Sequence, residues 1–215
     1  MKKIKISLFA TCLLLAGSQA THAISAQVWG GYNLSGGYSD LDTALTGLDT
    51  TYKASGYTTN GATSKTGGVA FGADAWAGLA AMPGLDIGLG LAYLPIYSLD
   101  FSATKTGASA SMKGDITAIP VLAQARLVLG SFYVAAGAGY SIGSGKITTT
   151  ATSGSVTSTA TSASTGSALT LMGLGGFNFI STSALKIGVE ARLYLVLDSS
   201  SVFNFVPSVK AEVGF

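Results

Sequence analysis

The stretch that decides the fold lies at the carboxyl end of the chain and reads Phe205-Val206-Pro207-Ser208-Val209-Lys210-Ala211-Glu212-Val213-Gly214-Phe215. Counted back from Phe215, every second residue is apolar, and the residues between them are small, charged or polar apart from Val206. An alternation with a period of two predicts a β-strand that has one apolar face and one polar face. Such a strand suits a wall that separates an apolar surrounding from a polar interior.

The amino-terminal residues predict a secretory signal peptide. Lys2, Lys3 and Lys5 form a basic start, residues 6–16 are mostly apolar, and residues 17–23 offer small-residue cleavage sites. The apolar run is shorter than the roughly 20 residues that a membrane-spanning helix needs. We expect cleavage after Ala23, with Ala20 as the alternative, so that residues 1–23 are the signal peptide and residues 24–215 form one domain.

Cleavage removes the only cysteine, Cys12, and the only histidine, His22. A lipid anchor on Cys12 is disfavoured because this residue lies inside the apolar run. Without cysteine the mature chain forms no disulfide. Removing three lysines lowers the Lys+Arg count from 12 to 9 against 10 Asp+Glu, which leaves a net charge of about −1. No basic patch survives, and we therefore expect no nucleic-acid partner.

The full chain is apolar on average, with a mean hydropathy of +0.48, yet the mature part has no long apolar run and its apolar residues are spread by alternation. The alternation predicts strands at 26–36, 69–79, 85–97, 116–129, 132–142, 168–180, 185–197 and 205–215. Short turns are expected at 82–84, 130–131 and 181–183, and longer polar loops at 37–66, 98–114, 143–167 and 198–204. This pattern predicts an all-β fold: an eight-stranded antiparallel transmembrane β-barrel with up-and-down order, its short turns in the periplasm and its long loops outside the cell.

Outward-facing aromatic residues collect near the predicted strand ends and form two girdles, as expected at the two membrane interfaces. The outer girdle consists of Tyr32, Phe71, Tyr93, Tyr140 and Phe205, and the inner girdle of Phe132, Phe179 and Phe215.

The mature chain resembles the small outer-membrane barrels that include the transmembrane domain of outer-membrane protein A and the opacity-type proteins. The residues that carry the resemblance are Val28-Trp29-Gly30-Gly31-Tyr32, Ile119-Pro120-Val121 with Ala125-Arg126-Leu127, and the terminal Val213-Gly214-Phe215. The resemblance implies the barrel fold and a bacterial outer-membrane location, and says little about function. The periplasmic peptidoglycan-binding domain that some relatives carry is not expected here.

Eight charged residues fall in the inward phase of the predicted strands. They are Asp74, Asp86, Arg126, Lys186, Glu190, Arg192, Lys210 and Glu212. Four of each sign favour a network of ion pairs, because buried charges need partners, and eight strands enclose a space that side chains can fill. The inward Trp29, Trp76, Tyr133 and Tyr194 add bulk among inward glycines. The alternatives are an ion-conducting lumen or a carboxylate pair for acid–base chemistry.

The same charges predict the register of the last two strands. Glu190 opposite Glu212 would also oppose Arg192 to Lys210, and like-charge pairs across strands are unfavourable. We therefore expect Glu190 to lie opposite Lys210, or Arg192 opposite Glu212.

No catalytic, cofactor or metal site is expected. Barrel enzymes of the outer membrane generally use a catalytic histidine, which the mature chain lacks, and zinc loses its usual ligands for the same reason. Asp40, Asp42 and Asp49 do not have the spacing of a calcium loop. We therefore predict that this protein is not an enzyme.

The predicted function is that of a closed, side-chain-filled barrel that acts as a structural or surface-interaction scaffold through its outer loops. Residues 143–167 are expected to be a flexible, low-complexity cover. The alternative is a narrow channel for ions or small solutes. The expected partners are outer-membrane lipids and lipopolysaccharide, the barrel-assembly machinery through the strand that ends in Phe215, and a surface or host ligand at loops 37–66 and 143–167.

Overall fold

The computed structural model describes residues 24–37, 39–197 and 202–215. The predicted signal peptide and both of its cleavage sites lie outside the described residues. No helix within the described ranges is both long and apolar enough to cross a membrane.

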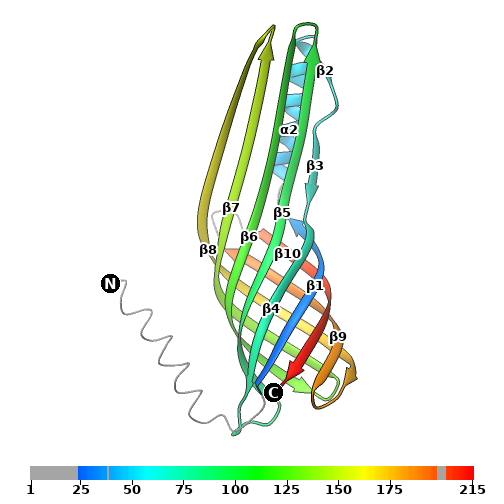
Figure 1. Ribbon diagram of the computed structural model, residues 1–215, viewed down its shortest axis with the longest axis vertical. Coiled ribbons are helices and arrows are strands. Elements are labelled where there is room, and N and C mark those ends of the chain that lie inside the picture. The colour runs from blue at the N-terminus through cyan, green and yellow to red at the C-terminus, as the bar shows by residue number, and fades with distance from the viewer. Residues whose placement is uncertain (1–23, 38, 198–201) are drawn as a thin grey trace, which may run out of the picture.

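Eight antiparallel strands form a closed ring in chain order (Figure 1). They are β1 (Ile24–Gly36), β4 (Gly68–Gly78), β5 (Leu85–Lys105), β6 (Ala108–Leu129), β7 (Phe132–Ser153), β8 (Val156–Ser181), β9 (Leu185–Leu197) and β10 (Val202–Gly214). The first and last strands close the ring, with pairing that runs from Ser25↔Gly214 to Gly36↔Phe203. The ring confirms the predicted eight-stranded up-and-down barrel.

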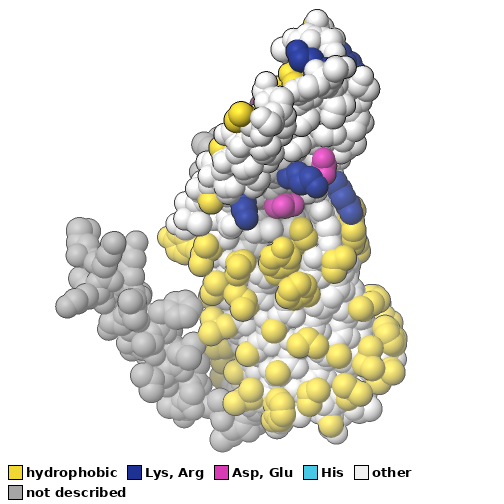
Figure 2. Space-filling model, turned by 45° about the horizontal axis from the view of Figure 1, so that its top comes forward, with side chains coloured by type: hydrophobic (Ala, Val, Ile, Leu, Met, Phe, Trp, Pro, Cys, Tyr) yellow, Lys and Arg dark blue, Asp and Glu magenta, His cyan; other side chains and the backbone are white. Residues whose placement is uncertain are grey.

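The outside of the ring is apolar and the inside is polar and aromatic. Val28, Val69, Val121, Val134 and Val209 are among the large apolar side chains that point outward and are exposed. In the space-filling view these side chains form a broad apolar belt around the lower part of the molecule (Figure 2). An exposed belt of this size matches the lipid-facing surface of a barrel rather than the surface of a protein surrounded by water.

Strands β5 to β8 continue far beyond the barrel, so the prediction of polar loops at 98–114 and 143–167 was wrong. Pairing between β5 and β6 continues to Lys105↔Ala108, and pairing between β7 and β8 continues to Ser153↔Val156. Each hairpin closes with a two-residue turn that contains a glycine at positive φ, Gly107 (φ 77) or Gly154 (φ 59). Threonine favours strands, and these turns hold the register. We call the part of β5–β8 formed by residues 98–114 and 143–168 the upper sheet.

The first predicted loop, 37–66, also contains regular structure, which corrects the prediction. It holds helix α2 (Ser39–Ala54) and the short strands β2 (Thr58–Thr59) and β3 (Thr63–Thr66), both of which pair with β5. The first turn of α2 is acidic and its last turn contains Lys53, which complements the helix dipole. Leu45 of α2 is buried in an apolar cluster at the upper mouth of the barrel with Ile96, Tyr97, Ala118, Val196 and Val202.

Candidate functional site

All eight predicted lumen charges take part in ion pairs inside the barrel. Each of the four carboxylates contacts at least one arginine or lysine, and Asp86 and Lys186 are the most accessible members. The residues form two clusters, which we name after their central side chains, Arg192 and Glu212. Acid–base chemistry needs a carboxylate that can reach a reacting group, whereas these carboxylates are occupied by basic partners.

The Arg192 cluster lies in the middle of the barrel. The guanidinium of Arg192 is 2.6 Å from Asp74 and 2.6 Å from Glu190, and all three side chains are at most 1% exposed. The amide of Gln124 donates to Asp74 at 2.9 Å. The guanidinium also lies 4.3 Å from the ring of Trp29, which adds a cation–π contact on the remaining side. Two buried carboxylates therefore share one buried cation, and the excess negative charge of this cluster is balanced by the excess positive charge of the other cluster.

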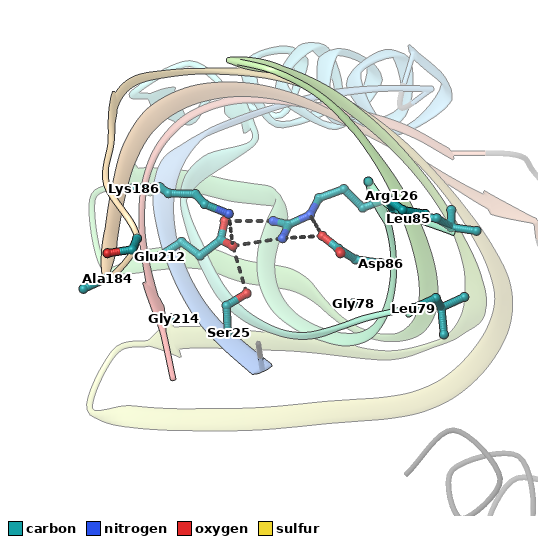
Figure 3. A pocket seen from close by; sticks show the side chains of 13 residues that line it. Ser25, Gly78, Leu79, Leu85, Asp86, Arg126, Ala184, Lys186, Glu212 and Gly214 are labelled. Atoms are coloured by element: carbon teal, nitrogen blue, oxygen red, sulfur yellow. Dashed lines mark hydrogen bonds and ion pairs between the residues drawn. The ribbon is translucent and has the colours of Figure 1, made fainter. Parts of the chain in front are cut away.

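The Glu212 cluster lies at the end of the barrel that carries the short turns (Figure 3). Glu212 accepts a bidentate contact from Arg126 at 2.8 and 2.9 Å, a contact from Lys210 at 2.7 Å, and one from Lys186 at 3.3 Å. Arg126 also reaches Asp86, and the hydroxyl of Ser25 donates to Glu212 at 2.8 Å. A pocket of about 240 Å³ opens next to this cluster. The cluster joins strands from both sides of the β1–β10 seam.

Uncharged side chains connect the two clusters. The pattern of charged residues in the sequence did not indicate this role. Gln27 donates to Glu190 and to Asp74, while its carbonyl oxygen lies 3.5 Å from both Arg126 and Lys210. Tyr133 donates to Glu190 at 3.0 Å. Both residues occupy inward positions of their strands. This position in the alternation is the one feature of the sequence that could have placed them in the lumen.

The predicted register of β9 and β10 was wrong, although the unfavourable Glu190–Glu212 pair is avoided. Glu190 lies opposite Ser208, and Glu212 lies opposite Lys186. The reason is that β10 begins at Val202, which pairs with Val196, so the connection is shorter than the expected loop 198–204. Of that loop, residues 198–201 lie outside the described ranges. Lys210 lies opposite Gly188.

Aromatic side chains fill the lumen by lying against inward glycines of neighbouring strands. A Cβ added to Gly88 would lie 2.7 Å from the Trp76 ring, and one added to Gly176 would lie 2.2 Å from the Tyr133 ring. Trp76, Tyr133 and Tyr194 are almost completely buried. The glycines are therefore the complement of the aromatic residues, and both are needed to fill the space.

The predicted girdle residues lie on the outer surface, but Tyr93 and Tyr140 are in the middle of β5 and β7, because these strands continue into the upper sheet. The rings of Phe71 and Tyr93 stack with centroids 5.2 Å apart, and Phe132 packs against Phe177 at 4.8 Å. Tyr32, Tyr140, Phe179 and Phe215 are exposed, whereas Phe205 is half-buried.

The aspartates of the first predicted loop lie on or at the start of α2 and do not come together around an ion. Asp42 accepts the hydroxyl of Tyr97 at 3.0 Å. Asp49 pairs with Lys53 at 2.6 Å and accepts the hydroxyl of Thr59. Across the described ranges, no group of three or more His, Cys, Asp or Glu side chains could hold a metal ion.

The two edges of the upper sheet differ. On the β5 side, β3 pairs from Thr63↔Asp100 to Thr66↔Tyr97, and β2 pairs further up. On the β8 side, pairing with β9 stops at Leu169↔Leu197, and no strand among the described residues pairs with residues 156–168 on that side. This segment contains only Val, Thr, Ser, Ala and Gly. Among the described residues, one edge is therefore covered by β2 and β3, and the other edge is open.

A ladder of threonine pairs lies on the outer face of the upper sheet. The hydroxyls of Thr148 and Thr161, Thr150 and Thr159, and Thr152 and Thr157 lie 3.3, 3.2 and 3.1 Å apart. Cross-strand hydroxyl pairs of this kind stabilise a hairpin that buries little apolar surface.

No family model matches the chain, and no curated protein matches it. Solved structures with a similar fold include Neisserial surface protein A, with 11% identity, 90% of this chain and 99% of that chain covered, and a TM-score of 0.46. Ail of Yersinia pestis, solved with the heparin analogue sucrose octasulfate, has 13% identity, 89% and 99% coverage, and a TM-score of 0.43. The N-terminal β-barrel domain of Pseudomonas aeruginosa OprF has 10% identity, 92% and 100% coverage, and a TM-score of 0.40. By its own ring of eight antiparallel strands, the chain has the fold of the small outer-membrane barrels that its sequence resembles.

Proposed function

We propose that this protein is an integral barrel of the bacterial outer membrane, that its lumen is closed, and that the open β8 edge of its upper sheet binds an extended segment of a partner protein outside the cell. The apolar belt and the girdles support the membrane location. The observation that carries the binding function is the difference between the two edges of the upper sheet.

Burial and charge balance support the closed lumen. Gln27, Asp74, Arg192, Tyr194 and Val206 come from four strands, β1, β4, β9 and β10, and are all almost inaccessible to water. The four acidic and four basic residues are joined in ion pairs. A selective pore more often presents an excess of one sign.

Alternate residues of β8 direct their backbone N–H and C=O groups to opposite sides of the strand, and this alternation identifies the backbone groups that are available at the open edge. The amide of Asn178 donates to the carbonyl of Ser131 on the β7 side. The β7–β8 register then continues without a shift from Phe132↔Phe177 to Ser153↔Val156. Because residues alternate in an antiparallel pair, even-numbered residues of β8 bond to β7. Odd-numbered residues direct their N–H and C=O groups to the open edge. These residues are Thr157, Thr159, Thr161, Ala163, Thr165 and Ser167.

An edge of this kind is a template for strand addition. Natural edges are usually protected by charge, proline or bulges, and residues 156–168 have neither charge nor proline, nor a break in register with β7. The neutral Thr, Ser and Ala side chains fit a partner strand that is rich in small residues. Main-chain hydrogen bonds supply the affinity in this recognition mode.

A pair of proline substitutions tests this function. Ala163→Pro removes an N–H from the open edge, and Ala160→Pro removes one that bonds to β7. The probe is a labelled synthetic peptide with the sequence of residues 141–153, which is the strand that β8 already pairs with on its other side. We expect measurable fluorescence anisotropy with the refolded protein, at least a tenfold loss with Ala163→Pro, and unchanged barrel mobility in a heat-modifiability gel.

Ala160→Pro serves as the matched control, because it should disturb the upper hairpin and leave the barrel folded. Absence of peptide binding to the unchanged protein, or full binding by Ala163→Pro, would refute strand addition at this edge.

Planar-bilayer recording tests the closed lumen separately. We expect no stable conductance from the refolded chain. A large and lasting conductance would favour the alternative function, a narrow channel for ions or small solutes.

The carboxyl-terminal strand is proposed to carry the signal for the barrel-assembly machinery. Val213 and Phe215 are both exposed at its end, on the outer side of the ring. Removal of Phe215 should slow insertion in cells and leave spontaneous refolding in detergent unchanged.

A further inference from the structure

A mixed-charge patch lies on the outer face of the molecule, on one side only. It consists of Lys65 of β3, Asp100 of β5, Lys113 and Asp115 of β6, and Lys146 of β7. Cross-strand pairing places these residues in two adjacent rows, Lys65↔Ser98↔Asp115↔Lys146 and Thr63↔Asp100↔Lys113↔Thr148. Figure 2 shows basic and acidic side chains gathered just above the apolar belt. We call these five residues the β3–β7 patch.

Three of the five charges in the β3–β7 patch have no ionic partner among the residues that the structure describes. The only ion pair among the five joins Lys113 to Asp100 at 3.4 Å, and these side chains are 71% and 50% exposed. Lys65 lies 5.8 Å from the ring of Tyr32, a girdle residue, and makes no ion pair with any described side chain. Lys146 and Asp115 are exposed opposite one another. The patch can therefore offer two ammonium groups and a carboxylate to a ligand.

The β3–β7 patch lies just above the apolar belt, where lipid headgroups would be. Asp115 and Lys146 are each four residues along their strands from the exposed apolar residues Ile119 and Ile142, about 14 Å at 3.4 Å per residue. The same face that meets acyl chains at Ile119 therefore meets headgroups at Asp115. A pocket of about 260 Å³, lined by Lys65, Lys113, both aspartates and the hydroxyl residues Thr63, Ser64 and Ser98, lies at this height.

We propose that the β3–β7 patch is a binding site for the phosphorylated sugar headgroup of an outer-leaflet glycolipid. Lys65 and Lys146 bind phosphate, while Asp115 and the hydroxyl residues of the pocket face sugar hydroxyls or a bridging divalent cation. The acyl chains of the same molecule lie on the apolar belt directly below. This inference rests on the outer-membrane location in the proposed function. The patch adjoins β8 only through Lys146, whose cross-strand neighbour is Ala163, and its other four residues lie on β3, β5 and β6.

The test measures lipid retention by native mass spectrometry of the refolded protein. The probes are bisphosphorylated lipid A and the same lipid after phosphatase treatment, each with and without added inorganic phosphate. The test variant is Lys65→Gln/Lys146→Gln. The control is Lys53→Gln/Lys105→Gln, which changes charge equally but on α2 and at the β5–β6 tip, where Lys105 lies 4.3 Å from the Tyr57 ring.

We expect retention of bisphosphorylated lipid A to fall about fivefold for each lysine lost, or roughly 25-fold for the double variant. The control should retain the lipid normally, and phosphatase treatment should remove the difference between variants. Equal retention by the two double variants, or no dependence on the lipid phosphates, would overturn the proposal. Full competition by inorganic phosphate alone would also overturn it, because the site would then recognise a free anion.

The outcome is separable from that of strand addition. The Lys65→Gln/Lys146→Gln variant should still bind the peptide of residues 141–153, and Ala163→Pro should still retain lipid A. A chain that fails to insert into lipid vesicles at all would refute the membrane location that both proposals share.

Discussion

The barrel wall and the upper sheet consist of the same strands, but different interactions hold them together. In the barrel, each strand has an apolar face toward the outside and a face toward a lumen packed with ion pairs and aromatic rings. In the upper sheet, residues 156–167 of β8 are exposed on both faces, and the cross-strand contacts are mainly between hydroxyl groups.

This difference shows how one hairpin can be rigid at one end and available for binding at the other. The lower part has an apolar outer face, which in the proposed function contacts lipid, and an inner face with buried ion pairs, so its residues are constrained on both faces. The upper part keeps its register through the continuous ladder and a glycine turn, and its faces are free. We therefore expect substitutions in the two regions to differ strongly in their effect on the free energy of unfolding.

The largest effect is expected for Arg192→Met in the lumen. This change leaves Asp74 and Glu190 buried without their shared cation, and breaking a buried pair costs about 3–5 kcal/mol. Urea unfolding in detergent micelles measures the loss. As a control, the triple variant Arg192→Met/Asp74→Asn/Glu190→Gln removes all three charges and should recover most of the stability. If the triple variant is as unstable as the single one, unpaired charge is not the cause.

The next effect concerns the apolar belt. Val189 is 46% exposed and lies opposite Val209 and Phe177 on the outer face. Val189→Arg should cost about 2–4 kcal/mol in a bilayer, as for a basic residue near the membrane centre. The matched change Thr165→Arg, in the upper sheet, should stay within about 0.5 kcal/mol. Equal costs at the two positions, measured by unfolding in lipid vesicles, would show that the belt does not face lipid.

Two adjacent glycines of β8 provide a sharper test of lumen packing. Gly176→Ala places a methyl group against the Tyr133 ring and should cost about 1–3 kcal/mol. Gly175→Ala meets nothing within 4 Å and should change stability by less than about 0.5 kcal/mol. The difference between the two midpoints of denaturation is the measurement, and similar midpoints would mean that the Tyr133 ring can move aside.

The smallest effect is expected in α2 at low pH. The hydrogen bond from Lys53, followed by that from Thr59, lowers the pKa of Asp49 below its ordinary value. Because the pKa of Asp49 is lower in the folded protein than in the unfolded chain, where it is near 3.9, the ionised carboxylate stabilises the fold at a pH above about 3.9. This stabilisation is lost as the pH falls through the pKa of the folded state. NMR shifts of α2 should therefore change below about pH 4 while those of the barrel strands do not. Asp49→Asn should remove the pH dependence, and a dependence that persists would assign it to another group.

The alternation of residue types made the barrel predictable, because lipid and lumen impose a period of two on every spanning strand. The inward phase of Asp74, Glu190 and Arg192 followed from the same period. Helix α2 was missed because threonine, serine and glycine dominate residues 37–66, although Leu41, Leu45, Leu48 and Tyr52 recur at helical spacing. Residues 143–168 of the upper sheet were missed because small and hydroxyl residues dominate them without a clear alternation in polarity. In residues 98–104, Leu99, Phe101 and Ala103 do alternate with polar residues, but the serine, threonine and glycine content favoured a loop.

The sequence by itself determined the number of spanning strands, their inward and outward faces, and the charge balance of the lumen, because each depends on local periodicity. Only the tertiary structure decided which charges meet. Asp74 and Arg192 are 118 positions apart, and their contact depends on ring closure and on the register of several strands together. Only the tertiary structure revealed the open edge of β8, because an edge is defined by the strand that does not pair with it, and pairing is not a local property of the chain.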